Sequence, residues 1–157
     1  MVVALSTVLS LIKIYELPQG GSVTAGSMVP LLWFSLRRGA PAGVFACSIY
    51  GLIQLILEPF IVNPIQFLLD YPMAFGVLGL AGLFKKYPPI GVGVGMIGRF
   101  TFHFLSGVVF FGQYAPQGMS PILYSALYNG GYMTIEFIIS TILIFALVKR
   151  KLLNIYL

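Results

Sequence analysis

The chain has 157 residues, of which 59% are hydrophobic and only 8% are charged. A soluble domain carries about 25% charged residues, so this composition excludes a soluble globular domain, and it equally excludes a disordered chain. A helix that crosses a bilayer takes about 20 residues, so about six such helices fit in the chain. We expect one integral-membrane domain over residues 1–157, with an all-α fold of six transmembrane helices.

Apolar runs follow one another along the chain, separated by charged or helix-breaking segments. Lipid offers the backbone no hydrogen-bond partner, so each run is predicted to be a helix. The expected helices span about 1–14, 25–36, 41–57, 64–84, 90–111 and 121–148. The first of them is short, because 14 residues cover about 21 Å of a hydrocarbon core about 30 Å thick. We therefore expect this helix to begin before residue 1.

The charges sort by position relative to the predicted helices. Basic residues follow the second, fourth and sixth runs: Arg37, Arg38, Lys85, Lys86, Lys149, Arg150 and Lys151. Glu16 and Glu58 follow the first and third runs, with Lys13 as the nearby cation. The positive-inside rule places the basic end in the cytoplasm, together with both termini. The loops at 15–24, 58–63 and 112–120 then face outward. Because the basic residues behind the net charge of +5 gather at one end of the helices, we expect them to anchor the chain in the lipid bilayer and not to bind nucleic acid, with a docking surface for a cytoplasmic partner as the alternative.

Polar side chains inside the predicted helices need a reason, because an ionisable group at membrane depth is by default a functional candidate. The alternative for Arg99 is a structural ion pair with Glu136. Asp70, His103 and Asn129 lie about 9, 14 and 12 Å below the outer ends of their helices, at a rise of 1.5 Å per residue. We expect these three side chains to share a depth near the outer face.

Helical spacing extends this group to a pocket. Gly107 and Phe111 follow His103 at steps of four residues, so they continue the same face of one helix, and Tyr124 lies about 5 Å inside the last helix. A carboxylate among aromatic rings favours a flat organic cation, since each cation–π contact contributes roughly 0.5–2 kcal/mol. The residues alone thus predict an outward-facing pocket for a cationic aromatic solute.

The remaining motifs give no support for nucleotide binding, ATP hydrolysis or a metal site. Residues 93–98 match G-x-G-x-x-G, but without a preceding strand they are not a dinucleotide site. The chain has no G-x-x-x-x-G-K-[ST] motif and cannot itself hydrolyse ATP. One histidine and one cysteine do not make a usual metal site, and Cys47 is expected to be a buried packing residue. An intramembrane enzyme using His103 and Ser106 remains the alternative from another functional class.

Several segments taken together resemble the thiamine-specific substrate-binding (S) component of energy-coupling factor (ECF) transporters, the ThiT family. They are Leu17–Ser22, Pro30–Gly39, Gln66–Tyr71, Phe102–Gly107, Gln113–Pro116 and Tyr124–Gly130. The resemblance covers nearly the whole chain and implies a six-helix S-component fold with a thiamine pocket near the outer face. An S component for another vitamin, such as riboflavin, remains an alternative.

The resemblance also implies residue roles. The family's ligand-binding positions fall on Asp70, Tyr71, His103, Gly107, Phe111, Tyr124 and Asn129. Gly21 stands where some members have a tryptophan in the first outer loop, whereas Trp33 is expected to be a packing residue. The implied mechanism needs no cofactor and no enzymatic step. The assembly lies in the cell membrane of a prokaryote. The outer loop closes over thiamine, and a transmembrane coupling protein with two cytosolic ATPase subunits then drives release of thiamine into the cell. Ala4 is the candidate docking residue for the coupling protein.

Overall fold

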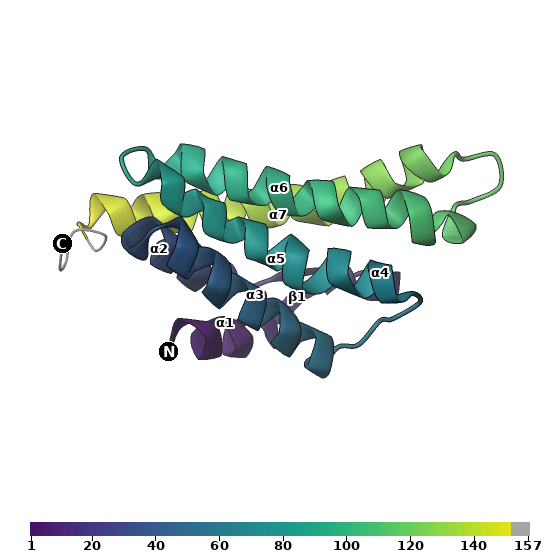
Figure 1. The fold of residues 1–157 in the computed structure, drawn as a ribbon. Coiled ribbons are helices and arrows are strands. Elements are labelled where there is room, and N and C mark those ends of the chain that lie inside the picture. The colour runs from purple at the N-terminus through teal and green to yellow at the C-terminus, as the bar shows by residue number, and fades with distance from the viewer. Residues whose placement is uncertain (152–157) are drawn as a thin grey trace.

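Six helical segments form the body of the molecule (Figure 1), which is a computed structural model that describes residues 1–151. The expected all-α membrane bundle is confirmed. The segments are α1 (Val2–Ser10), α2 (Val29–Arg38), α3 (Ala40–Leu57), a composite fourth segment (Pro64–Phe84), α6 (Pro88–Phe110) and α7 (Pro121–Lys149). Short 3₁₀ turns lie at η1 (Pro18–Gly20) and η4 (Gly112–Tyr114). Within the described residues, four helices are long and apolar enough to cross a membrane, namely α3, the fourth segment, α6 and α7.

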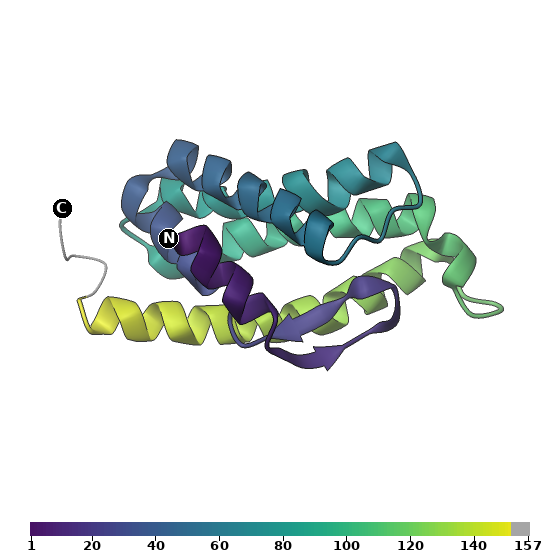
Figure 2. The same ribbon diagram turned by 90° about the horizontal axis from the view of Figure 1, so that it is seen from below.

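The first apolar run departs from the expected helix over 1–14. Helix α1 ends at Ser10, and the chain continues as an antiparallel hairpin of β1 (Lys13–Glu16) and β2 (Ser22–Thr24). Pairing between the two strands satisfies backbone groups that lipid would leave unpaired. β1 is mostly exposed, whereas Val23 and Thr24 of β2 are buried. The segment expected as an outer loop is therefore an ordered hairpin, and Figure 2 shows it alongside α7.

The two ends of the bundle differ in charge as the sequence predicts. Figure 1 shows the α3–α4 and α6–α7 connections at one end, with the turn before α6 and the end of α7 at the other. The second end carries the basic residues. Helix α2 has Arg37 and Arg38 in its last turn and stops at Gly39, whose φ of 99° favours glycine. A side-chain carbon at Gly39 would lie 3.5 Å from Lys85, so the two basic turns are neighbours.

The fourth segment changes its helical type along its length. α4 (Pro64–Leu68) begins at Asn63, whose side chain accepts a hydrogen bond from the Ile65 amide. A π-helical turn, η2 (Leu69–Met73), follows, and the segment continues as α5 (Ala74–Gly76) and the 3₁₀ segment η3 (Val77–Phe84). Pro72 lies inside the π turn. Proline has no amide hydrogen and displaces the carbonyl one turn earlier, which explains the wider turn at this point.

Glycines allow the helices to approach closely, as expected from their spacing. A Cβ atom at Gly79 would overlap the backbone of Gly43 and Val44 on α3. One at Gly91 would lie 2.6 Å from the Ala81 carbonyl oxygen. Small residues at helix interfaces are a usual means of packing in membranes, where no hydrophobic effect drives helices together.

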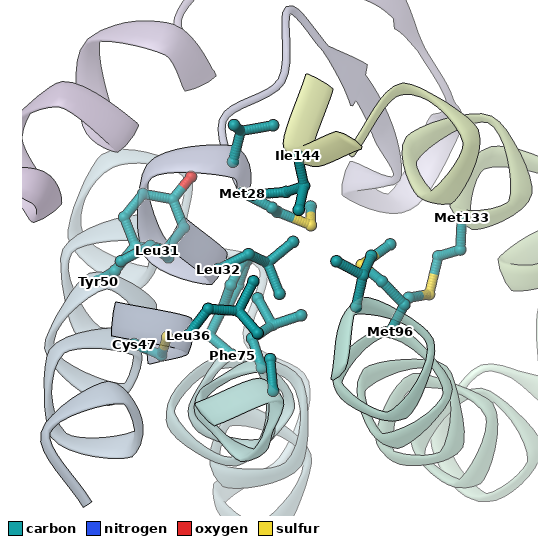
Figure 3. Packing of buried hydrophobic residues seen from close by; sticks show 14 of the residues in the cluster. Met28, Leu31, Leu32, Leu36, Cys47, Tyr50, Phe75, Met96, Met133 and Ile144 are labelled. Atoms are coloured by element: carbon teal, nitrogen blue, oxygen red, sulfur yellow. The ribbon is translucent and has the colours of Figure 1, made fainter. Parts of the chain in front are cut away.

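The core lies around α2, which is the most enclosed helix. Figure 3 shows side chains of α2 facing those of α3, α5, α6 and α7. The labelled residues are Met28, Leu31, Leu32, Leu36, Cys47, Tyr50, Phe75, Met96, Met133 and Ile144. Cys47 has no exposed surface, which confirms the expectation of a buried packing residue. Trp33 packs at the edge of this core, also as expected.

Candidate ligand-binding site

A cavity lies beside the hairpin, between α3, the fourth segment, α6 and α7. With its open mouth it encloses about 880 Å³, a size typical of small-molecule sites. Its lining includes all seven residues that the resemblance singled out, Asp70, Tyr71, His103, Gly107, Phe111, Tyr124 and Asn129. Three separate segments of the chain, namely the fourth segment, α6 with the residue that follows it, and α7, therefore bring the expected polar and aromatic groups to one place.

Asp70 lies at the centre of the polar network. Its Oδ1 is 3.0 Å from His103 Nδ1, and its Oδ2 accepts hydrogen bonds from Gln66 Nε2 and Ser106 Oγ, both at 2.7 Å. The side chain of Asp70 is 14% exposed. A carboxylate can accept about four hydrogen bonds, so Asp70 keeps capacity for a ligand.

Arg99 and Asp70 together determine which ring nitrogen of His103 carries a hydrogen. The Arg99 Nε–H donates to His103 Nε2 at 3.3 Å, so this ring nitrogen is an acceptor. The other nitrogen, Nδ1, then carries the hydrogen and donates it to Asp70. This assignment makes the imidazole neutral, since the doubly protonated ring would have no acceptor nitrogen.

The expected ion pair between Arg99 and Glu136 is wrong, because no ion pair joins them among residues 1–151. The Arg99 guanidinium lies over the Phe75 ring, 4.3 Å from its centroid, and contacts Met28 Sδ at 2.5 Å. The Glu136 carboxylate instead accepts hydrogen bonds from Thr24, at 2.5 Å from the amide and 2.8 Å from the hydroxyl. The arginine therefore belongs to the cavity wall, and the glutamate anchors β2 on α7.

The charges of the wall favour a cation. Two carboxylates, Glu58 and Asp70, and one guanidinium, Arg99, line the cavity, so its formal charge is −1 when His103 is neutral. Near the mouth, Lys13 pairs with Glu58 at 2.6 Å and with Glu16 at 2.7 Å. Partial burial lowers the pKa of Lys13, but its hydrogen bonds to the two glutamates outweigh this effect and hold the pKa above its ordinary value.

Aromatic rings form two further parts of the wall. Phe111 stacks on Phe60 with ring centroids 5.7 Å apart and an interplanar angle of 27°. On α7, Tyr124, Tyr128 and Tyr132 form a ladder with successive centroids 5.9 and 6.0 Å apart. Such faces can bind a flat cation through stacking and cation–π contacts.

Three of the expected ligand-binding residues also hold their neighbours. The Tyr71 hydroxyl donates to the Glu58 carbonyl and accepts from the Phe60 amide, at 2.8 and 2.9 Å, so it fixes the α3–α4 connection. Asn129 Nδ2 donates to the Ser125 carbonyl at 3.1 Å. A Cβ atom at Gly107 would overlap the Ser125 side chain, so α6 and α7 meet closely here.

The arrangement of His103 and Ser106 is unlike that of a nucleophile and its base. Ser106 donates its hydroxyl hydrogen to Asp70, and His103 donates to the same carboxylate. A serine nucleophile requires a base that accepts its proton, in hydrogen-bond reach and oriented by a third group. Both residues instead orient Asp70 as an acceptor, which is the geometry of a binding site.

Sequence reasoning missed part of the cavity. Gln54 lies on α3 and Phe60 lies shortly after its end. Tyr128 lies on the face of α7 that contacts the hairpin at Gly21. A signal for Gln66 was available, because it is a polar residue one helical turn before Asp70 within a predicted membrane helix. Ala4 lies elsewhere, on the exposed side of α1.

The chain resembles known transport proteins over most of its length. Residues 1–155 match the family described as "Thiamine transporter protein (Thia_YuaJ)". The chain is 36% identical over 146 residues to the thiamine transporter ThiT of Bacillus subtilis, covering 82% of this chain and 76% of that protein. It is 34% identical over 124 residues to ThiT of Lacticaseibacillus paracasei, covering 66% and 62%.

A solved structure has the same fold. The structure of ThiT from Listeria monocytogenes superposes with a TM-score of 0.86 at 27% identity. The match covers 95% of this chain and 90% of that one.

Proposed function

Because the chain belongs to the thiamine transporter protein (Thia_YuaJ) family, we propose that it captures thiamine in the described cavity as the substrate-binding component of a vitamin importer. The observation that carries this proposal is the position of Asp70, a carboxylate that three donors orient toward a cavity with aromatic walls. Thiamine carries a positively charged thiazolium ring joined by a methylene bridge to an aminopyrimidine ring, so its charge matches the carboxylate and its two planar rings can stack on the aromatic walls of this site. The chain supplies binding energy and specificity, and no chemical step.

A direct test is titration calorimetry on the detergent-solubilised protein. We expect thiamine to bind with one-to-one stoichiometry and to be recovered unreacted. Riboflavin is the comparison ligand, because its neutral ring system does not use the cavity's negative charge. Binding of riboflavin but not thiamine would show that the chain is a binding component for another vitamin. Conversion of thiamine to a product would support the alternative of an intramembrane enzyme.

Ser106 is expected to have a moderate effect on this binding. The Ser106→Ala substitution removes one of the three hydrogen bonds that orient the Asp70 carboxylate. A hydrogen bond to a charged group contributes about 1.5–3 kcal/mol, but Gln66 and His103 still hold the carboxylate. We therefore expect thiamine affinity to fall about three- to tenfold in calorimetry.

Thr101→Val is the matched control for Ser106→Ala. Thr101 lies on the same helix, is exposed, and its hydroxyl donates to the backbone carbonyl of Ile97. This substitution is expected to leave thiamine affinity unchanged. Equal affinities for the Ser106→Ala variant and the unsubstituted protein would mean that Ser106 does not support ligand binding.

We further propose that release of thiamine needs partners in the cell membrane of a prokaryote, with both termini of the chain in the cytoplasm. The partners are a transmembrane coupling protein, docked near Ala4 on the exposed side of α1, and two cytosolic ATPase subunits. The chain itself has no nucleotide-binding motif. In reconstituted vesicles, the chain alone should bind thiamine without accumulating it, whereas the full assembly should accumulate it only with ATP. ATP-independent accumulation by the chain alone would contradict this proposal.

A further inference from the structure

One short stretch of the hairpin borders the cavity at its mouth. We call residues 17–22 the cover segment, and Figure 2 shows the hairpin that contains it beside α7. Gln19, Gly20, Gly21 and Ser22 line the cavity. Gln19 and Gly20 have φ angles of 63° and 88°, so the chain reverses here through two left-handed residues. This tight turn places the tip of the hairpin at the mouth of the cavity.

A single side chain of α7 contacts the cover segment on both sides of this turn. The Tyr128 hydroxyl accepts a hydrogen bond from the Gly21 amide at 3.0 Å. The same hydroxyl donates its hydrogen to the Pro18 carbonyl. Donor and acceptor capacity of one phenol are thus both used on the cover segment.

The contact requires a residue without a side chain at position 21, and Gly21 meets this requirement. A Cβ atom at Gly21 would lie 2.7 Å from the Tyr128 hydroxyl oxygen and 3.1 Å from Tyr132 Cδ1. A larger residue at this position would therefore push the cover segment away from α7. The aromatic group at this wall of the cavity comes from Tyr128 itself, which also lines it.

The base of the hairpin is held independently of Tyr128. The Thr24 amide and hydroxyl both donate to the buried Glu136 carboxylate on α7. On the other side, Lys13 of β1 pairs with Glu58 at the end of α3. Loss of the Tyr128 hydroxyl would release the tip of the hairpin while these contacts keep its base in place.

We infer that Tyr128 is a positioning residue that holds the cover segment across the cavity, and that its hydroxyl thereby sets the rate at which the ligand leaves. The inference rests on the proposed function for the identity of the ligand, thiamine. The hydrogen bonds to Gly21 and Pro18 are what must break before the tip can move away. A ligand enclosed behind the tip leaves only after that step.

The Tyr128→Phe variant tests this inference, because it keeps the ring and removes only the hydroxyl. We expect radiolabelled thiamine to dissociate about tenfold faster when chased with unlabelled thiamine. The equilibrium affinity should change less than the dissociation rate, since an open mouth also speeds entry. Tyr87→Phe is the matched control, because Tyr87 is exposed in the turn before α6, and its dissociation rate should equal that of the unsubstituted protein.

A second measurement needs no ligand. Hydrogen exchange at the Leu17 and Gly21 amides, which are hydrogen-bonded within and from the cover segment, should be faster in Tyr128→Phe, whereas the Thr24 amide should stay protected by Glu136. This measurement decides the inference even if the unsubstituted protein fails to bind thiamine, which would overturn only the proposed function. Unchanged exchange at the Leu17 and Gly21 amides together with an unchanged dissociation rate would overturn the inference.

A variant on the other side of the contact guards against a folding defect in Tyr128→Phe. Gly21→Ala introduces the Cβ that would meet the Tyr128 hydroxyl and should reproduce both effects. Gly93→Ala is its control, because a Cβ there has nothing within 4 Å. If Gly21→Ala folds and leaves dissociation and exchange unchanged, the inference is wrong.

Discussion

The Asp70→Asn substitution is expected to weaken thiamine binding at least tenfold while the protein still folds. Asparagine has nearly the same shape, but it removes the charge and so takes the formal charge of the cavity wall from −1 to zero. It also presents an NH₂ group to a donor in either orientation, because His103 donates to Asp70 Oδ1 and both Gln66 and Ser106 donate to Oδ2. A charge-assisted hydrogen bond contributes about 1.5–3 kcal/mol, which is roughly a ten- to hundredfold change in affinity.

The measurement is calorimetry with thiamine, together with a thermal unfolding curve that checks the fold. Glu16→Gln is a matched control, since it also removes a carboxylate near the mouth, but one that pairs with Lys13 and does not line the cavity. The control should bind thiamine almost as tightly as the unsubstituted protein. An unchanged affinity in Asp70→Asn would remove Asp70 from the ligand site.

The Gly79→Val substitution is expected to prevent stable folding. A Cβ atom at Gly79 would overlap the backbone of Gly43 and Val44. Backbone in a packed helix cannot rotate aside as a side chain can, so α3 and η3 must separate along their length. Overpacking a core costs about 1–3 kcal/mol even where side chains can adjust, and loss of helix contact adds to this cost.

Size-exclusion chromatography in detergent and the thermal unfolding midpoint report this effect. We expect aggregation, or a midpoint well below that of the unsubstituted protein. Gly93→Val serves as the control, because its position on α6 opens onto free space. A Gly79→Val protein that elutes and unfolds like the unsubstituted one would show that close contact between α3 and η3 does not support the fold.

Hydropathy and charge predicted the helical bundle because lipid imposes a single constraint on the backbone. Helices α3, α6 and α7 lie within two residues of the expected bounds, and the basic turns gather at one end. The polar residues of the cavity were predictable for a related reason. Asp70, His103 and Asn129 have no other means of avoiding lipid than to face one another inside the bundle.

The hairpin and the actual partners of Arg99 and Glu136 were not predictable in this way. The sequence predicts that residues 11–14 continue the helix, and only pairing with β2, which itself packs on α7, selects the strand. Glu136 finds its donors on Thr24, which lies 112 positions away in sequence. Such pairings depend on the order in which helices lie side by side, and neither spacing nor hydropathy encodes that order.

The enclosed position of Cys47 has a practical consequence for following motion in this protein. Its sulfur lies in the packed interior, with no exposed surface, and thiol reagents react with accessible thiolates. A cysteine placed at Gln19 would thus be the sole sulfhydryl within reach of a fluorophore or spin label in the folded protein. Spectroscopic probes can be attached at a chosen point without first removing the native cysteine.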